Sequence, residues 1–141
     1  MSFLFRAPLI AAAALVAGCA ATDPNCPPAG SPLPPRALVG AWDARIGDDS
    51  TAIRVLLQPH PDYAGVRGQV LRGDMAAQVA GDINDQGLLL LDESEDGQRI
   101  SATWEGEALA RSCGRVFRGQ WRRAGEDRGL PFELTRSLST P

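Results

Sequence analysis

After Leu38, apolar and polar residues alternate in short runs, and clusters of Gly, Asp, Asn and Pro interrupt the runs about every ten positions, as turns do between adjacent strands. Successive side chains of a β-strand point to opposite faces of the sheet, so this alternation is typical of strands with one buried face. It predicts an all-β fold, a single small antiparallel meander of eight strands that forms a barrel or a barrel-like sandwich, with no helix beyond a single turn. The strands are predicted at 38–46, 52–58, 64–71, 77–83, 87–92, 99–108, 115–123 and 130–136.

Glycine recurs inside the predicted strands with large apolar residues two positions away on one or both sides. The five instances are Leu38-x-Gly40-x-Trp42, Val66-x-Gly68-x-Val70, Val79-x-Gly81-x-Ile83, Trp104-x-Gly106-x-Ala108 and Phe117-x-Gly119-x-Trp121. Glycine inside a strand loses packing and costs conformational entropy, so its recurrence requires a structural reason. A tight bend of the strand, as in the closing of a small barrel, is such a reason. We therefore expect these glycines to share the inner face of a barrel with their apolar neighbours.

One face of the eight strands is predicted to form the core. Its side chains are Trp42, Ile46, Ile53, Val55, Leu57, Val66, Val70, Val79, Ile83, Ile100, Trp104, Phe117, Trp121, Leu130, Phe132 and Leu134. An eight-stranded barrel is just wide enough for its interior to be filled by side chains or to hold one small ligand. Three Trp and two Phe in this set favour a filled interior. In a hollow barrel, a small apolar ligand would bind near Trp42, Trp104 and Trp121.

The predicted barrel resembles the calycin-like group of small β-barrels, which includes avidins, lipocalins and lipid-anchored barrel protease inhibitors. The resemblance spans residues 38–137 and rests on Gly40-x-Trp42, the eight-strand meander and the closing Phe132-x-Leu134-x-Arg136. It implies either binding of a macromolecule, as in the barrel inhibitors, or a carrier of a small apolar ligand. The polar biotin cradle of avidins has no counterpart, because Tyr63, the only tyrosine, falls in a predicted turn and Asn84 is the only asparagine of the domain.

The N-terminal sequence is typical of a secretory signal: Arg6 precedes an apolar stretch, Ala7–Ala17, that is too short to cross a membrane as a helix. Val16-Ala17-Gly18-Cys19 resembles the lipobox of bacterial lipoproteins, in which the signal peptide is cut before the cysteine and the thiol is acylated, palmitate being a typical chain. The resemblance implies lipid on Cys19 and anchoring in a membrane. Ala20, in place of aspartate, implies the outer membrane, on its periplasmic face. An ordinary signal peptide cut nearby, an uncleaved anchor and surface display are the alternatives.

Two cysteines remain, Cys26 and Cys113, and in an oxidising compartment they are expected to form one disulfide. Free thiols or intermolecular pairing are the alternatives. The proline-rich segment after Cys19 favours an extended tether. The chain is therefore predicted to divide into a signal peptide (1–18), a lipidated tether (19–36), a barrel domain (37–137) and a short tail (138–141).

Few residues are suited to catalysis or metal binding. His60 is the only histidine, and we expect it in an exposed turn. The serines and threonines of the domain have no base predicted beside them to activate a nucleophile. The acidic run Asp92–Asp96 lacks the glycine-spaced ligands of calcium loops, so we expect a solvated hairpin tip in place of a calcium site. These observations predict no enzymatic activity, no metal and no cofactor.

The charges argue against a nucleic-acid partner, because 17 acidic residues outnumber 14 arginines and give a net charge of −3. They are unevenly placed: residues 74–107 hold nine acids and one arginine, whereas residues 111–123 hold five arginines and no acid. Cross-strand ion pairs are expected to account for much of this. A basic strip around Arg118 and Arg122 that binds anionic lipid, lipopolysaccharide or peptidoglycan is the alternative. We expect a monomeric, non-catalytic envelope lipoprotein that binds a protein or an envelope glycan, including as the inhibitor of a periplasmic hydrolase.

Overall fold

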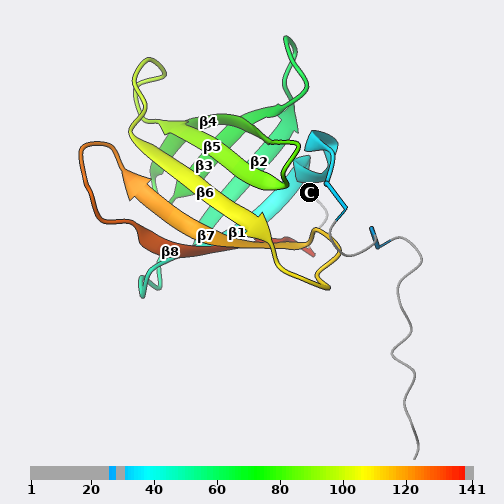
Figure 1. Cartoon of the computed structure of the whole chain (residues 1–141). Coiled ribbons are helices and arrows are strands. Elements are labelled where there is room, and N and C mark those ends of the chain that lie inside the picture. The colour runs from blue at the N-terminus through cyan, green and yellow to red at the C-terminus, as the bar shows by residue number, and fades with distance from the viewer. Residues whose placement is uncertain (1–25, 28–30, 139–141) are drawn as a thin grey trace, which may run out of the picture.

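The protein is a closed barrel of eight antiparallel strands in meander order, in which each strand pairs with the next and β8 pairs with β1 (Figure 1). The computed structural model describes residues 26–27 and 31–138. The predicted signal peptide and Cys19 lie outside these residues. The elements are the 3₁₀ helix η1 (Pro35–Leu38) and the strands β1 (Gly40–Ile46), β2 (Ile53–Pro59), β3 (Val66–Arg72), β4 (Met75–Ile83), β5 (Leu88–Ser94), β6 (Ala102–Ala108), β7 (Val116–Arg123) and β8 (Leu130–Arg136). The all-β class and the eight-strand meander are confirmed, as a closed barrel.

Six strands begin one to three residues later than the sequence pattern indicates, and for the first and the sixth the local cause is plain. The first begins at Gly40 because Pro34 and Pro35 start a short helical turn, η1, that includes Leu38. The sixth begins at Ala102 because the preceding loop, 95–101, is folded around Asp96, whose carboxylate accepts the backbone N–H groups of two loop residues at 2.8 Å. Short polar side chains of this kind compete with strand pairing and favour turns.

The barrel interior is packed with side chains, as predicted. Two aromatic pairs meet edge to face inside it: Trp42 with Phe117, at 5.6 Å between ring centroids, and Trp104 with Phe132, at 5.1 Å. Such pairs add to the stabilisation that apolar burial provides. The buried side chains outside the predicted core are Leu38, Ala44, Ala77, Leu89, Leu91, Glu93 and Ala102.

Two residues predicted in the core are exposed. Ile100 is 51% exposed because it lies in the loop between β5 and β6 and not in a strand. Leu130 is 43% exposed because it is the first residue of β8, at one end of the barrel, where the interior opens to solvent. Both predictions were wrong for the same reason: alternation of polar and apolar residues does not show where a strand leaves the barrel.

The strand glycines allow neighbouring strands to approach closely on the inner face. A Cβ on Gly68 would lie 1.7 Å from the carbonyl oxygen of Leu56 on β2. A Cβ on Gly119 would lie 1.9 Å from the carbonyl oxygen of Glu105 on β6. No side chain fits at such distances, so the recurrence of glycine follows from the tight curvature of a small barrel.

One end of the barrel is closed by η1, and we call it the closed end. Leu38 of η1 is fully buried, and its carbonyl accepts a hydrogen bond of 2.7 Å from Nε1 of Trp42. Arg136 of β8 donates to the carbonyls of Ala37 and Val39, and its guanidinium lies 4.4 Å from the centre of the Trp42 ring. These contacts join the start of the domain to its last strand.

The N-terminal segment is also fixed at the closed end. Cys26 forms a disulfide with Cys113 in the connection between β6 and β7, which confirms the predicted pairing. Leu33 packs against the hydrophobic core and lies beside Gly114. The chain therefore enters the barrel at the end that η1 covers. Among residues 26–27 and 31–138, no helix has the length and apolar character to cross a bilayer.

Candidate functional site

The opposite end of the barrel, which we call the mouth, is bordered by four strand connections: 47–52, 73–74, 95–101 and 124–129. In Figure 1 the mouth faces left, away from η1, and the yellow-green β5–β6 loop and the orange β7–β8 loop stand beside it. A depression of about 370 Å³ lies at the mouth. Its lining is Ile46, Asp49, Thr51, Ile53, Arg72, Met75, Glu93, Glu95, Ser101, Ala102, Trp121, Arg123 and Leu130.

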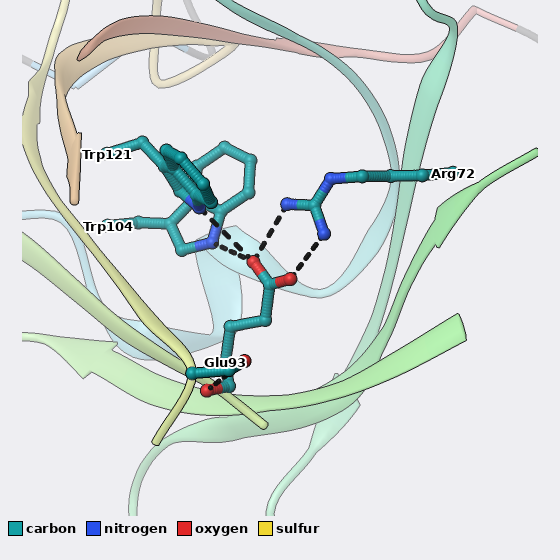
Figure 2. Close-up of polar contacts among 5 residues, drawn as sticks. Arg72, Glu93, Trp104 and Trp121 are labelled. Atoms are coloured by element: carbon teal, nitrogen blue, oxygen red, sulfur yellow. Dashed lines mark hydrogen bonds and ion pairs between the residues drawn. The ribbon is translucent and has the colours of Figure 1, made fainter. Parts of the chain in front are cut away.

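Glu93 is the buried charged residue of this depression, with 1% of its surface exposed. Arg72, across the barrel on β3, donates from its two terminal nitrogens to the two carboxylate oxygens, the Nη2–Oε2 bond being 2.9 Å long (Figure 2). Oε2 also accepts from the indole N–H groups of Trp104, at 3.0 Å, and Trp121, at 3.3 Å. Figure 2 shows both indoles and the guanidinium converging on the carboxylate. Four donors thus satisfy one carboxylate.

The position of Glu93 corrects the prediction of a solvated acidic turn at Asp92–Asp96. Leu89, Leu91 and Glu93 alternate along β5, and all three side chains are buried. The predicted strand ends at residue 92, whereas β5 continues to Ser94. The period of two, extended by one residue, would have placed Glu93 on the inner face.

The carboxylate of Glu93 is ionised. Burial raises its pKa, but the hydrogen bonds and charge of Arg72, together with the two indole N–H groups, outweigh that effect and hold the pKa below its ordinary value. A general acid or base requires a pKa near the working pH, and Glu93 is shifted away from it. The arrangement therefore forms a rigid, charge-compensated floor of the depression.

Apolar side chains are exposed around this polar floor. Met75 is 62% exposed and Leu130 is 43% exposed, and both line the depression. Ile100, in the neighbouring 95–101 loop, is 51% exposed. The guanidinium groups of Arg72 and Arg123 each lie 5.6 Å from the centre of the Trp121 ring. The mouth thus combines exposed apolar side chains with a fixed polar network at the floor of the depression.

The three tryptophans proposed as a ligand site do not lie together. Trp104 and Trp121 face each other across β6 and β7 and bond to Glu93 at the mouth. Trp42 lies at the closed end, bonded to Leu38 and covered by Arg136. A ligand at the mouth would therefore contact the region of Trp121 and not that of Trp42.

Other residues considered in the sequence form no comparable site. His60 lies in the β2–β3 connection, where its ring is 4.0 Å from that of Tyr63 and its Nδ1 accepts the N–H of Asp62 at 3.2 Å. In the part of the chain that the structure describes, no group of three His, Cys, Asp or Glu side chains is arranged to hold a metal. A depression of about 910 Å³ lies beside the β1–β2 loop and shares Asp49, Thr51 and Ile53 with the depression at the mouth.

The predicted basic strip is partly compensated by a cross-strand ion pair. Arg118 on β7 binds Glu133 on β8, with 2.7 Å between Nη2 and Oε2. The register also places Arg118 opposite Glu107 of β6. The ion pair of Arg118 therefore joins β7 to β8.

The fold and site define a small closed antiparallel β-barrel with one plugged end and one open end with a buried ion pair. No protein-family model matches the chain, and no curated protein matches it in sequence.

Proposed function

We propose that this protein is a non-catalytic lipoprotein of the bacterial cell envelope, which binds a protein partner through the mouth of its barrel. The lipid is carried by Cys19, and the protein is held at the outer membrane on its periplasmic face. The observation that carries this proposal is the position of Cys26, seven residues after Cys19: its disulfide fixes the N-terminal segment at the closed end, opposite the mouth. An anchored barrel of this kind presents its mouth away from the anchor.

The chemistry of the mouth supports binding over catalysis. Its buried carboxylate, Glu93, is saturated by donors from Arg72, Trp104 and Trp121 and has a lowered pKa. The exposed apolar side chains of Met75 and Leu130 stand at the edge of the depression. A pocket bordered by apolar residues and floored by a rigid polar network is suited to anchor a side chain of a partner.

A carrier of a small apolar ligand is less well supported. The interior between the closed end and Glu93 is occupied by Trp42, Phe117, Trp104 and Phe132, packed edge to face. A carrier requires a cavity in this volume. Addition of fatty acids should therefore leave the tryptophan fluorescence of the folded protein unchanged, whereas strong quenching would favour the carrier.

Site-specific photocrosslinking in cells tests the proposed partner site. A photoreactive amino acid is placed at Met75 or Leu130 in the mouth, and, as matched exposed controls, at Tyr63 or Leu109 in the closed-end connections. We expect protein adducts from the mouth positions and not from the controls. Adducts from the closed end alone, or equal adducts from all four positions, would contradict the proposal.

The anchor is tested separately by metabolic labelling. Cells supplied with radiolabelled palmitate should incorporate label into the full-length protein, and Cys19→Ser should abolish the incorporation. The Cys26→Ser/Cys113→Ser variant is the control, because it removes the other two cysteines and leaves the predicted lipidation site intact. Label retained in Cys19→Ser would refute lipidation at this residue.

A further inference from the structure

We infer that the mouth accepts a basic segment of a partner protein, which places one apolar side chain in the depression. This inference rests on the proposed function, because it names the chemistry of the partner that the mouth binds. Three features of the described residues support it: the acidic residues of the mouth connections, the pairing of arginines with carboxylates and the apolar side chains of the depression.

The connections that border the mouth are acidic. The four segments 47–52, 73–74, 95–101 and 124–129 contain seven acidic residues and two arginines. The acidic residues are Asp48, Asp49, Asp74, Glu95, Asp96, Glu126 and Asp127. The closed-end connections 60–65, 84–87 and 109–115 contain two acids and two arginines. The acidic surplus is therefore a property of the mouth and not of the barrel ends in general.

Two acids of the mouth, Asp49 and Asp96, are fixed by hydrogen bonds within their loops. The backbone N–H and hydroxyl of Thr51 bond to the carboxylate of Asp49 and lower its pKa. The backbone N–H groups of Arg99 and Gln98 do the same for Asp96. The charge of Asp49 is therefore in place before any partner arrives, whereas that of Asp96 is shared with Arg99.

Three arginines at the mouth already face carboxylates. Arg72 is paired with Glu93, Arg99 with Asp96 at 3.1 Å, and Arg123 lies 3.9 Å from Glu126. Their positive charges are compensated by Glu93, Asp96 and Glu126, which leaves five acids of the mouth connections against one arginine, Arg128. An anionic partner would approach the acidic connections of the mouth, and like charges brought together at an interface are strongly unfavourable. This argues against anionic lipid or lipopolysaccharide as the ligand of the mouth.

The depression supplies the apolar part of the site. Its wall includes Ile46, Ile53 and Trp121, and the exposed Met75 and Leu130 extend that surface outwards. A volume of about 370 Å³ accommodates a large side chain. Binding energy at protein interfaces is concentrated where such an anchor enters a pocket, and surrounding charges steer the encounter. A basic segment with one apolar residue satisfies both requirements.

Short synthetic peptides test this chemistry on the full-length protein in a non-ionic detergent. The probes are Lys-Lys-Leu-Lys-Lys, the charge-only peptide Lys-Lys-Ser-Lys-Lys and the reversed-charge peptide Glu-Glu-Leu-Glu-Glu. We expect the first to shift the amide resonances of Met75, Ala102 and Leu130, and the other two to bind at least several-fold more weakly. Equal binding of the reversed-charge peptide, or shifts confined to Tyr63 and Leu109, would overturn the inference.

Paired charge variants locate the effect. Glu95→Gln/Asp127→Asn removes two exposed charges from the mouth, and Asp62→Asn/Asp85→Asn removes two from the closed-end connections. The first should weaken binding of the basic peptide roughly two- to tenfold, as expected for two exposed ion pairs, and the second should leave it unchanged. Equal effects of the two variants would mean that only net charge is sensed, which contradicts a site at the mouth.

The photocrosslinking experiment separates this inference from the proposed function. If adducts form at Met75 and Glu95→Gln/Asp127→Asn reduces them several-fold, both stand. If the adducts persist undiminished in that variant, the mouth binds a protein but not through the acidic residues of its connections, and only the inference fails. If no mouth position forms an adduct, both fail.

Discussion

Arg72 and Glu93 form a two-pronged ion pair inside the mouth, between strands β3 and β5, which are not adjacent in the barrel. The Glu93 side chain is almost completely buried, whereas the Arg72 side chain is 24% exposed. The pair therefore joins two walls of the barrel across its interior, at a place where no backbone pairing does so. Removing a charged group from water is costly, and here four hydrogen bonds to one carboxylate offset that cost.

Loss of the Glu93 charge should strongly destabilise the barrel. Glu93→Gln keeps the size of the side chain, but it leaves Arg72 without its counter-charge in a partly buried position. We expect the free energy of unfolding, measured with urea, to fall by about 3 kcal/mol, the lower end of the effect of breaking a buried pair. Glu105→Gln, on the exposed face of β6, is the control and should cost less than about 0.5 kcal/mol.

A double variant tests whether the loss comes from the unpaired charge. Arg72→Met/Glu93→Leu removes both charges, so it should be more stable than Glu93→Gln alone. It should not regain the full stability, because the indole N–H groups of Trp104 and Trp121 lose their acceptor. A double variant no more stable than the single one would show that the charge of Arg72 is not the source of the loss.

The same carboxylate should make stability depend on pH under acidic conditions. The pKa of Glu93 lies below its ordinary value of 4.5 in the folded protein, so folding favours the ionised form. Its stabilising contribution is complete above pH 4.5 and is lost as the pH falls towards the folded-state pKa. In urea titrations between pH 7 and pH 3, the difference between wild type and Glu93→Gln should therefore be constant at first and then shrink. A difference that grows on acidification would contradict this assignment.

The barrel could be predicted from the sequence because its determinants are local. Alternation of apolar residues and the spacing of turn residues indicate strands without reference to tertiary structure. The recurrent glycines, such as Gly68 and Gly119, indicate curvature, because a side chain at either position would overlap a carbonyl of the neighbouring strand. These two signals together predicted a barrel or a barrel-like sandwich, and the structure shows the closed barrel.

The site could not be predicted in the same way, because it joins residues from four strands. Arg72, Glu93, Trp104 and Trp121 come together only through the register of the closed barrel. Glu93 was missed because it stands in the acidic run Asp92–Asp96, whose composition is typical of a solvated turn. Only its place two residues after Leu91 indicates that it points inward. Composition and periodicity conflicted here, and periodicity was right.

Close strand approach at Gly119 predicts a specific effect of adding one methyl group. In Gly119→Ala the new Cβ would lie 1.9 Å from the carbonyl oxygen of Glu105, so β6 and β7 must move apart. We expect a loss of about 3 kcal/mol in the free energy of unfolding, the upper end for overpacking. Gly125→Ala is the control: nothing lies within 4 Å of its new Cβ, and only its positive φ of 81° opposes the substitution. That variant should lose about 1 kcal/mol. Equal losses in the two variants would refute close strand contact as the reason for Gly119.

The disulfide between Cys26 and Cys113 should stabilise the folded protein mainly by restricting the unfolded chain. The two cysteines are separated by 87 positions, and a loop of this length corresponds to about 4 kcal/mol in the chain-entropy model. Cys26→Ser/Cys113→Ser should therefore unfold at lower urea concentration than the oxidised wild type. A reductant should shift the wild type towards the variant and leave the variant unchanged. Because the disulfide lies at the closed end, the Glu93 network should persist in the variant, which the tryptophan resonances of Trp104 and Trp121 would report. Loss of those resonance positions would show that the two ends of the barrel are coupled.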